Sequence, residues 1–366
     1  MKLQYEYWLF QLKGLGNKKK IRLVEAMGSA KKIYEASSKE LEEYKPLLSK
    51  YNIERIQMAK ESIRLESYKQ LTEKGISFAA FAGIDYPQRL SKIQDPPYGI
   101  LYQGKLPSDK ERTLAMIGAR ECSEYGKYIA REFASYLAPR GIQVISGLAR
   151  GIDGISQQAA LESGGYSLGV LGSGVDICYP REHRRIYEDL IQKGGILSEF
   201  PLGTAPKAQL FPARNRIISA LSDGLLVIEA KQKSGTLITV DQALEQGKDV
   251  YAIPGKIVES LSYGCNYLIK QGATIILSPK DLYDELTLGV GHYQWEGIEC
   301  KTPTIPRTSM EQAVYQALDS NPQTVDSICE QLNNMELVQV QCELLKLVLE
   351  GAAVQVSGNL FQKKYK

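Results

Sequence analysis

The chain has 366 residues, of which 43% are hydrophobic and 24% are charged, and its formal net charge is only +3. This length suffices for two or three modules, at least one of them with a sizeable buried core. No segment approaches the ~20 apolar residues needed to span a bilayer, and lysines interrupt the first thirty residues, so we expect a cytoplasmic protein without membrane contact.

Residues 1–74 are predicted to form a small helical domain, because their apolar positions recur at helical spacing, and this domain resembles the SAM or helix-hairpin-helix type. Residues 1–80 carry 16 Lys and Arg against 10 Asp and Glu, a balance that suits contact with phosphates. Gly14 and Gly16 separate two helical runs and precede Lys18, Lys19 and Lys20. The three lysines are candidate accessory DNA contacts, and a turn beside a solvated charge run is the alternative.

Residues 75–286 contain short apolar runs, rich in β-branched residues, that alternate with segments of helical length. The runs cover residues 114–117, 143–145, 168–171, 225–228, 250–253 and 274–277. This alternation predicts an α/β fold with a Rossmann-like core, a doubly wound and mainly parallel sheet with helices on both faces. Four of the runs are closely followed by a glycine, at the sheet edge where such folds bind ligands. These glycines are Gly118, Gly147, Gly172 and Gly255.

Residues 287–307 hold several glycines and prolines without periodicity, which predicts a linker. In residues 308–366, helices are expected near 310–318, 325–332 and 337–349, followed by two short strands, which is the outline of a C-terminal winged-helix domain. The third helix would enter a major groove, yet it offers Glu336, Glu343 and Glu350 against only Lys346. We therefore do not expect it to read duplex DNA.

Two loops at the predicted carboxyl edge pair a glycine with an arginine. In the first, Gly118 precedes Arg120, so backbone N–H groups and a guanidinium could hold a phosphate together, with a tight turn and a surface arginine as the alternative. In the second, Gly147 and Arg150 lie in a turn that begins a helix, whose free N–H groups favour an anion. Asp153 is expected to cap this helix.

Two more segments suit phosphate. Gly172, Ser173 and Gly174 end a strand and are a weak candidate cradle, since a lone Gly-x-Gly is common. Ser234, Gly235 and Thr236 begin a helix after another strand, with plain N-capping as the alternative.

The most specific segment runs from Phe211 through Arg214, Asn215 and Arg216. It is predicted to open a helix with both arginines in the first turn. Cations at a helix N-terminus oppose the macrodipole, and an anionic ligand would remove that conflict.

Taken in order along the chain, these segments resemble the DNA-processing protein A (DprA/Smf) family. The resemblance rests on Tyr86-Pro87, Leu90, Pro96-Pro97, Leu101-Tyr102, Gly104, Gly118, Arg120, residues 146–153, Tyr179-Pro180, residues 198–201, Phe211-Pro212, residues 214–218, Glu229-Ala230, residues 234–237, Thr239 and residues 253–255. It covers about residues 75–285. The chain departs from the family pattern at Ala119, at 154–157 and at His183, which changes polar groups and leaves the basic ones in place.

The resemblance implies a non-catalytic homodimer that protects incoming single-stranded DNA during natural transformation, in competent cells, and loads the recombinase RecA onto it. It places the DNA pocket in the loops described above, with Arg120, Arg214 and Arg216 as phosphate contacts and Lys207 on the approach. Phe211 or Tyr179 could stack a base.

Two other functions compete with this one. Rossmann-like relatives that hydrolyse nucleoside monophosphates use a Pro-Gly-Gly-x-Gly-Thr loop, where this chain has Lys233 before Ser234, Gly235 and Thr236. A duplex-binding regulator would depend on the acidic third helix of the tail. The composition favours neither a metal nor a cofactor, because the six cysteines form no Cys-x-x-Cys pair and only His183 and His292 are present.

Overall fold

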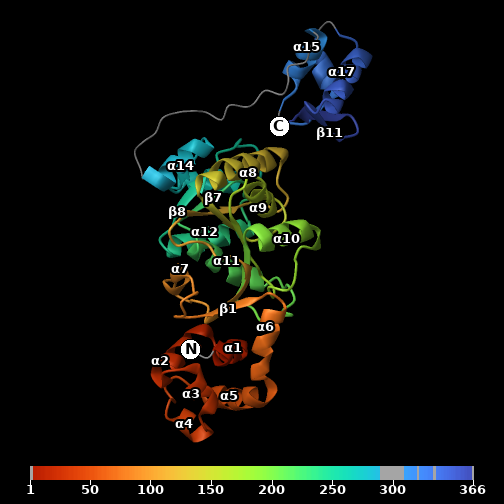
Figure 1. Ribbon diagram of the computed structural model, residues 1–366. Helices are drawn as coiled ribbons and strands as arrows, with labels where there is room; N and C mark the ends of the chain where they lie inside the picture. The colour runs from red at the N-terminus through yellow and green to blue at the C-terminus, as the bar shows by residue number, and fades with distance from the viewer. Residues whose placement is uncertain (1–2, 289–308, 320, 333–334, 365–366) are drawn as a thin grey trace. The chain divides into compact units, whose positions relative to one another are not determined.

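The computed structural model describes residues 3–288, 309–319, 321–332 and 335–364 (Figure 1). These residues form two compact units. The larger holds residues 3–121 and 130–288, and the smaller holds residues 122–129 and the described part of the C-terminal tail. Most of the predicted linker, at residues 289–307, lies outside the described residues.

The N-terminal region is helical, as its periodicity predicts. Its elements are α1 (Leu3–Gln11), α2 (Asn17–Met27), α3 (Ala30–Glu35), α4 (Ser38–Glu42), α5 (Lys50–Ser62), the 3-10 helix η1 (Leu65–Tyr68) and α6 (Lys69–Glu73). Ser29, Ser37 and Ser49 cap α3, α4 and α5 with their side chains, which satisfies backbone donors at these helix starts. Fully buried Trp8 and Ile56 belong to the hydrophobic cluster that also contains Phe78 of the first strand, so this region shares a core with the sheet.

A nine-stranded sheet follows, in the order β1-β2-β6-β5-β4-β3-β7-β8-β9. Its strands are β1 (Ser77–Ala80), β2 (Gly99–Gly104), β3 (Thr113–Ile117), β4 (Gln143–Ser146), β5 (Ser167–Val170), β6 (Gly195–Ser198), β7 (Gly224–Val227), β8 (Asp249–Ala252) and β9 (Thr274–Ile275). The seven strands from β6 to β9 pair in parallel, whereas β1 and β2 add an antiparallel edge. The predicted α/β fold with a mainly parallel sheet is confirmed.

Helices cover both faces of the sheet. The helices from β1 to the end of α14 are α7 (Gln88–Ser91), α8 (Glu124–Leu137), η2 (Ala138–Arg140), α9 (Ile152–Glu162), η3 (Arg181–His183), α10 (Arg184–Lys193), α11 (Leu210–Ala220), α12 (Gly235–Glu245), α13 (Tyr263–Lys270) and α14 (Pro279–Leu288). In β6, Ile196 joins the cluster that contains Leu190 of α10, and its neighbour Leu197 joins the one that contains Ile218 of α11. Because successive side chains of a strand point to opposite faces, both faces are buried under helices.

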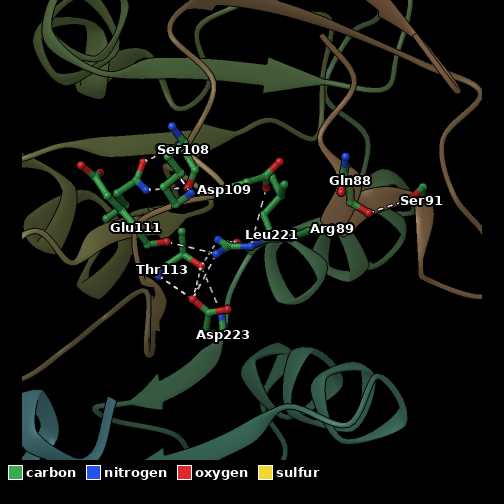
Figure 2. A network of polar contacts seen from close by, with 11 residues as sticks. Gln88, Arg89, Ser91, Ser108, Asp109, Glu111, Thr113, Leu221 and Asp223 are labelled. Atoms are coloured by element: carbon green, nitrogen blue, oxygen red, sulfur yellow. Dashed lines mark hydrogen bonds and ion pairs between the residues drawn. The ribbon is translucent and has the colours of Figure 1, made fainter. Parts of the chain in front are cut away.

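A polar network centred on Arg89 holds the amino edge of the sheet (Figure 2). Arg89 lies in the short helix α7 and donates to Thr113 Oγ1 at 2.6 Å, to the Leu221 carbonyl at 3.3 Å and to Asp223 Oδ2 at 3.3 Å. Asp223 Oδ2 also accepts from the Thr113 N–H at 2.9 Å. Thr113 begins β3 and Asp223 precedes β7, so the network fixes these two central strands at their amino ends. The opposite, carboxyl ends of the strands continue into loops.

The smaller unit contains the C-terminal helices and a three-stranded antiparallel sheet in the order β10-β12-β11. Its elements are α15 (Ser309–Ala317), β10 (Gln323–Thr324), α16 (Val325–Gln331), α17 (Leu337–Leu349), β11 (Ala353–Ser357) and β12 (Leu360–Lys363). The three helices lie where the periodicity predicts them. The strand β10 was not predicted, because two residues are too short to show a pattern.

Candidate functional site

A pocket of about 610 Å³ opens at the carboxyl edge of the sheet in the larger unit. Three segments supply most of its lining: the loop after β3, the start of α11, and the loop from β7 into α12. The lining residues that matter below are Gly118, Arg120, Glu121, Asp153, Tyr179, Phe211, Arg214, Asn215, Lys231, Lys233, Ser234, Gly235 and Thr236. The structure therefore brings together predicted site residues that are up to 118 positions apart, such as Gly118 and Thr236.

Phe211 lines the pocket and has one aromatic and two cationic neighbours. Its ring centroid is 5.7 Å from that of Tyr179, 5.6 Å from the Arg120 guanidinium and 6.0 Å from the Arg214 guanidinium. Tyr179 is 44% exposed and Phe211 is half-buried. Such a group of rings and cations can stack a planar group and attract an anion next to it.

Gly118 is a tightly packed glycine that joins the loop after β3 to the start of α12. A Cβ on Gly118 would lie 2.6 Å from Ile152 Cγ1 and 3.1 Å from the Glu229 carbonyl oxygen, so only glycine fits without displacement. Thr236 Oγ1 donates to the Gly118 carbonyl at 3.2 Å and ties the two loops together. Ser234 caps α12 by accepting from the Thr236 N–H at 3.2 Å, so the N-capping that was the alternative interpretation of Ser234 is present.

Lys231 and Lys233 line the pocket; the basic side chains of their segment suggested phosphate from the sequence, although the two lysines were not named as site residues. Both side chains are exposed in the loop after β7. Within the described chain, neither they nor Arg120 form an ion pair. The signal that could have identified them is their position between a strand end and the Ser-Gly-Thr helix start. The free helix N–H groups and these cations make this side of the pocket suited to an anion.

Arg214 is buried beneath the pocket. It is 4% exposed, and its Nη1 donates to the Gly147 carbonyl at 2.7 Å and to the Val170 carbonyl. Burial lowers the pKa of Arg214 to about 10, while the nearby Asp153 carboxylate opposes that shift. The guanidinium thus joins the ends of β4 and β5 and presents only a small part of itself to the pocket.

The prediction that two arginines open α11 is wrong. The helix begins at Leu210, so Arg214 and Arg216 are its fifth and seventh residues and lie beyond the first turn, where the macrodipole has faded. Arg216 does not line the pocket. It is paired with Glu199 through Nη2 and lies 3.8 Å from an Asp95 carboxylate oxygen.

Side chains of Asp153, Gln157 and His183 hold the loop between β4 and α9 by contacts to its backbone. Gly151, without a side chain, is the N-cap of α9, so the predicted capping role of Asp153 is wrong. Asp153 instead accepts from the Gly147 N–H at 3.1 Å, and burial raises its pKa. Leu148 has a φ of +54°, which is a strained conformation. Gln157 holds it by accepting from the Leu148 N–H at 2.9 Å, and His183 Nδ1 lies 3.1 Å from the Leu148 carbonyl oxygen.

The remaining predicted residues lie around the pocket without lining it. Gly172, Ser173 and Gly174 are buried, and a Cβ on Gly172 would lie 2.6 Å from the Phe211 ring, so this loop supports that ring from behind. Arg150 is exposed and paired with Glu182. Lys207 is exposed between Pro206 and Ala208, which both line the pocket.

The three candidate lysines of α2 differ in exposure. Lys18 and Lys19 are exposed, and Lys19 Nζ donates to Asn52 Oδ1 at 3.3 Å. Lys20 is 5% exposed and its Nζ donates to the Phe10 carbonyl at 2.7 Å, so it cannot reach a phosphate. Burial lowers the pKa of Lys20 to about 7.

Two further observations bear on the chemistry. Of the two carboxylates that line the pocket, Asp153 is held by Gly147 and Arg214, and Glu121 is exposed at the rim. The described residues include no cluster of three or more His, Cys, Asp and Glu arranged to hold a metal ion.

No helix in the described part of the chain has the length and apolarity required for a membrane span.

Comparison with known proteins gives consistent similarities. The model of a family described as DNA recombination-mediator protein A matches residues 77–287. Protein Smf of Escherichia coli (strain K12) is 38% identical over 284 residues, which are 75% of this chain and 74% of that protein. The structure of DNA processing protein A from Streptococcus pneumoniae is similar with a TM-score of 0.67 and 32% identity, over 77% of this chain and 98% of that one. DNA processing protein A from Helicobacter pylori, whose structure concerns its single-stranded DNA binding mode, has a TM-score of 0.52 and 28% identity, over 58% of this chain and 95% of that one.

Proposed function

Because the chain belongs to the DNA recombination-mediator protein A family, with relatives called DprA and Smf, we propose that it binds single-stranded DNA in the pocket at the carboxyl edge without cutting it. The observation that carries this proposal is the Phe211 ring, which has Tyr179 and Arg120 as neighbours in a pocket that Lys231 and Lys233 also line. Proteins that bind single strands without sequence preference combine stacking rings with cations that follow the backbone.

The residues divide into two roles. Arg120, Lys231, Lys233 and the N–H group of Gly235 contact phosphates, with Lys207 on the approach, while Ser234 and Thr236 hold the start of α12 in place. Phe211 and Tyr179 stack a base. Arg214 acts chiefly by holding the strand ends beneath the ring, and Arg216 acts through Glu199 rather than through DNA. The close packing that positions these groups depends on small residues, namely Gly118, Gly147, Gly172, Ser173 and Gly174. Asn215 lines the pocket beside Arg214.

The cellular role follows from the family. We propose that the chain protects incoming single-stranded DNA and loads RecA during natural transformation, as a homodimer. The order of helices and strands in residues 309–364 supports a winged-helix domain, and the positive φ of Gly14 beside exposed Lys18 and Lys19 supports a helix-hairpin-helix contact with DNA.

Hydrolysis of nucleoside monophosphates is the alternative function of such a pocket. A general base would have to reach the substrate with a free carboxylate. Of the two carboxylates in the lining, Asp153 is already bonded to Gly147 and lies next to Arg214, and Glu121 is exposed at the rim, which supports a binding role instead. Release of base from AMP by the purified chain, at a rate that Glu229→Gln changes, would overturn the non-catalytic proposal.

Binding of fluorescent oligo-dT at increasing salt tests the proposal. Affinity should fall steeply with salt, since each phosphate contact on a single strand contributes about 0.7 to the logarithmic slope. Arg120→Glu should weaken binding at least about tenfold and reduce the slope, whereas the matched variant Lys110→Glu, exposed at the amino edge, should leave both unchanged. Equal binding by Arg120→Glu and the unmodified chain would refute the site, and equal affinity for duplex DNA would refute the preference for single strands.

A further inference from the structure

The helix α17 of the smaller unit has two apolar faces, and only one of them is buried. Three of its side chains lie fully buried in the core of this unit, namely Val340, Leu344 and Leu347. Four other apolar side chains are exposed, namely Val338, Cys342, Leu345 and Leu349. At 3.6 residues per turn the two sets lie on nearly opposite sides of the helix. A surface helix ordinarily carries polar residues on the side away from the core, so the second face requires an explanation.

The exposed side chains form a continuous stripe. Val338 is 66% exposed, Leu345 44% and Leu349 88%, and Leu337, 44% exposed, adds apolar surface at the start of the helix. From Val338 to Leu349 the intervals are four, three and four residues, which is the spacing of the a and d positions in a coiled coil. Single exposed apolar residues are common, whereas a continuous stripe indicates an interaction surface, and this spacing is typical of a helix that packs against another helix.

The same face is poorly suited to DNA. In the winged-helix arrangement proposed above, α17 is the helix that would enter a major groove. The polar residues at the border of the stripe are Gln339, Gln341 and Lys346. Lys346 is already engaged, because its Nζ donates to Glu343 Oε1 at 2.7 Å. An apolar stripe with one paired lysine beside it cannot neutralise a row of phosphates.

The charge of the smaller unit favours a basic occupant. Residues 309–364 contain three lysines, no arginine and seven acidic residues. The exposed carboxylates are those of Asp326, Glu330, Glu336 and Glu350, and the exposed ammonium groups are those of Lys346 and Lys364. Glu336 and Glu350 lie at the two ends of α17, immediately before and after it. The surface around the stripe is therefore acidic, which attracts a cationic partner and repels a second copy of itself.

The size of the stripe also favours a single helix over a second copy of the chain. Eleven residues separate Val338 from Leu349, so the stripe is about 17 Å long and about 10 Å wide. A stable dimer buries about 800 Å² on each partner, several times the area of such a strip. One amphipathic helix of similar length would cover it completely.

We propose that the exposed face of α17 binds a basic amphipathic helix of another protein. The apolar side chains of that helix pack against Val338, Cys342, Leu345 and Leu349, and its lysines or arginines lie beside Glu336 and Glu350. This surface makes the smaller unit a module for binding a protein. The inference goes beyond the proposed DNA pocket and does not depend on it.

The experiment measures binding of a fluorescent synthetic helix of about three heptads to the full chain. The peptide has leucine at positions a and d and lysine at e and g. One control peptide has glutamate in place of the lysines, and a second has serine in place of the leucines. The basic apolar peptide should bind most tightly, because it alone matches both the stripe and the charge around it.

The double variant Leu345→Gln/Leu349→Gln should weaken binding of the basic peptide at least about tenfold, because it removes half of the stripe. Both side chains are exposed, and glutamine forms helices nearly as well as leucine, so circular dichroism of the variant should be unchanged. Val356→Gln is the matched control, since Val356 is an apolar residue of β11 that is 48% exposed and lies outside α17. It should bind the peptide as the unmodified chain does, and all three chains should bind oligo-dT equally.

Five results would overturn the inference. Absence of binding by the basic peptide would remove it outright, and so would equal binding by the double variant. Equal binding of the basic and the acidic peptides would remove the charge complementarity that identifies the partner. A lower mass of the double variant in sedimentation would assign the face to a second copy. Weaker binding of duplex DNA by the double variant would assign the face to DNA.

Discussion

Replacement of Arg214 by alanine tests whether this arginine holds the site from below. The change removes a buried guanidinium that donates to the Gly147 and Val170 carbonyls and leaves Asp153 buried without its cation. Each hydrogen bond from a charged donor contributes about 1.5–3 kcal/mol, and breaking a buried pair by removing one partner costs about 3–5 kcal/mol. We expect Arg214→Ala to lower the free energy of unfolding by about 3–5 kcal/mol.

Urea unfolding, followed by far-UV circular dichroism, measures this loss for the larger unit, and amide hydrogen exchange locates it in β4 and β5. Arg214→Lys should recover only part of the stability, because a single ammonium cannot reproduce the fork that reaches two carbonyls. Arg120→Ala is the control, since its exposed side chain should change stability by less than about 0.5 kcal/mol while it weakens DNA binding. An unfolding free energy of Arg214→Ala within about 1 kcal/mol of the unmodified chain would refute the reasoning.

Two further changes test the buried lysine and the packing behind the ring. The pKa of Lys20 is about 7 in the folded chain against 10.5 in the unfolded one, so the unfolded state binds more protons between these two pH values. The free energy of unfolding should therefore rise with pH, by roughly 2 kcal/mol between pH 7 and pH 9. Lys20→Met should flatten this rise in urea titrations at the two pH values, and an unchanged slope would show that Lys20 stays charged when folded. Gly172→Ala should push the Phe211 ring from its place, because the new Cβ would lie 2.6 Å from it, and so weaken oligo-dT binding about tenfold. Oligo-dT binding by Gly172→Ala equal to that of the unmodified chain would contradict the support role.

Some of the architecture follows from local sequence alone. The apolar runs at 114–117, 143–145, 168–171, 225–228 and 250–253 correspond to β3, β4, β5, β7 and β8, because a strand buried on both faces must be apolar throughout. The glycines that follow these runs predicted the carboxyl edge as the site, and the pocket is there. β6 and the antiparallel β1 and β2 were not predicted, since their pairing depends on distant partners.

The sequence by itself determined the family, the mainly parallel sheet and the loops that meet at its edge, because these depend on motifs and apolar runs that neighbouring residues define. It could not determine which cations are free. Arg216 is paired with Glu199, Arg150 with Glu182, and Lys20 is buried against Phe10, whereas Arg120 remains exposed. Each of these outcomes depends on a partner that only folding brings near, so only the tertiary structure decided which basic residues can reach DNA.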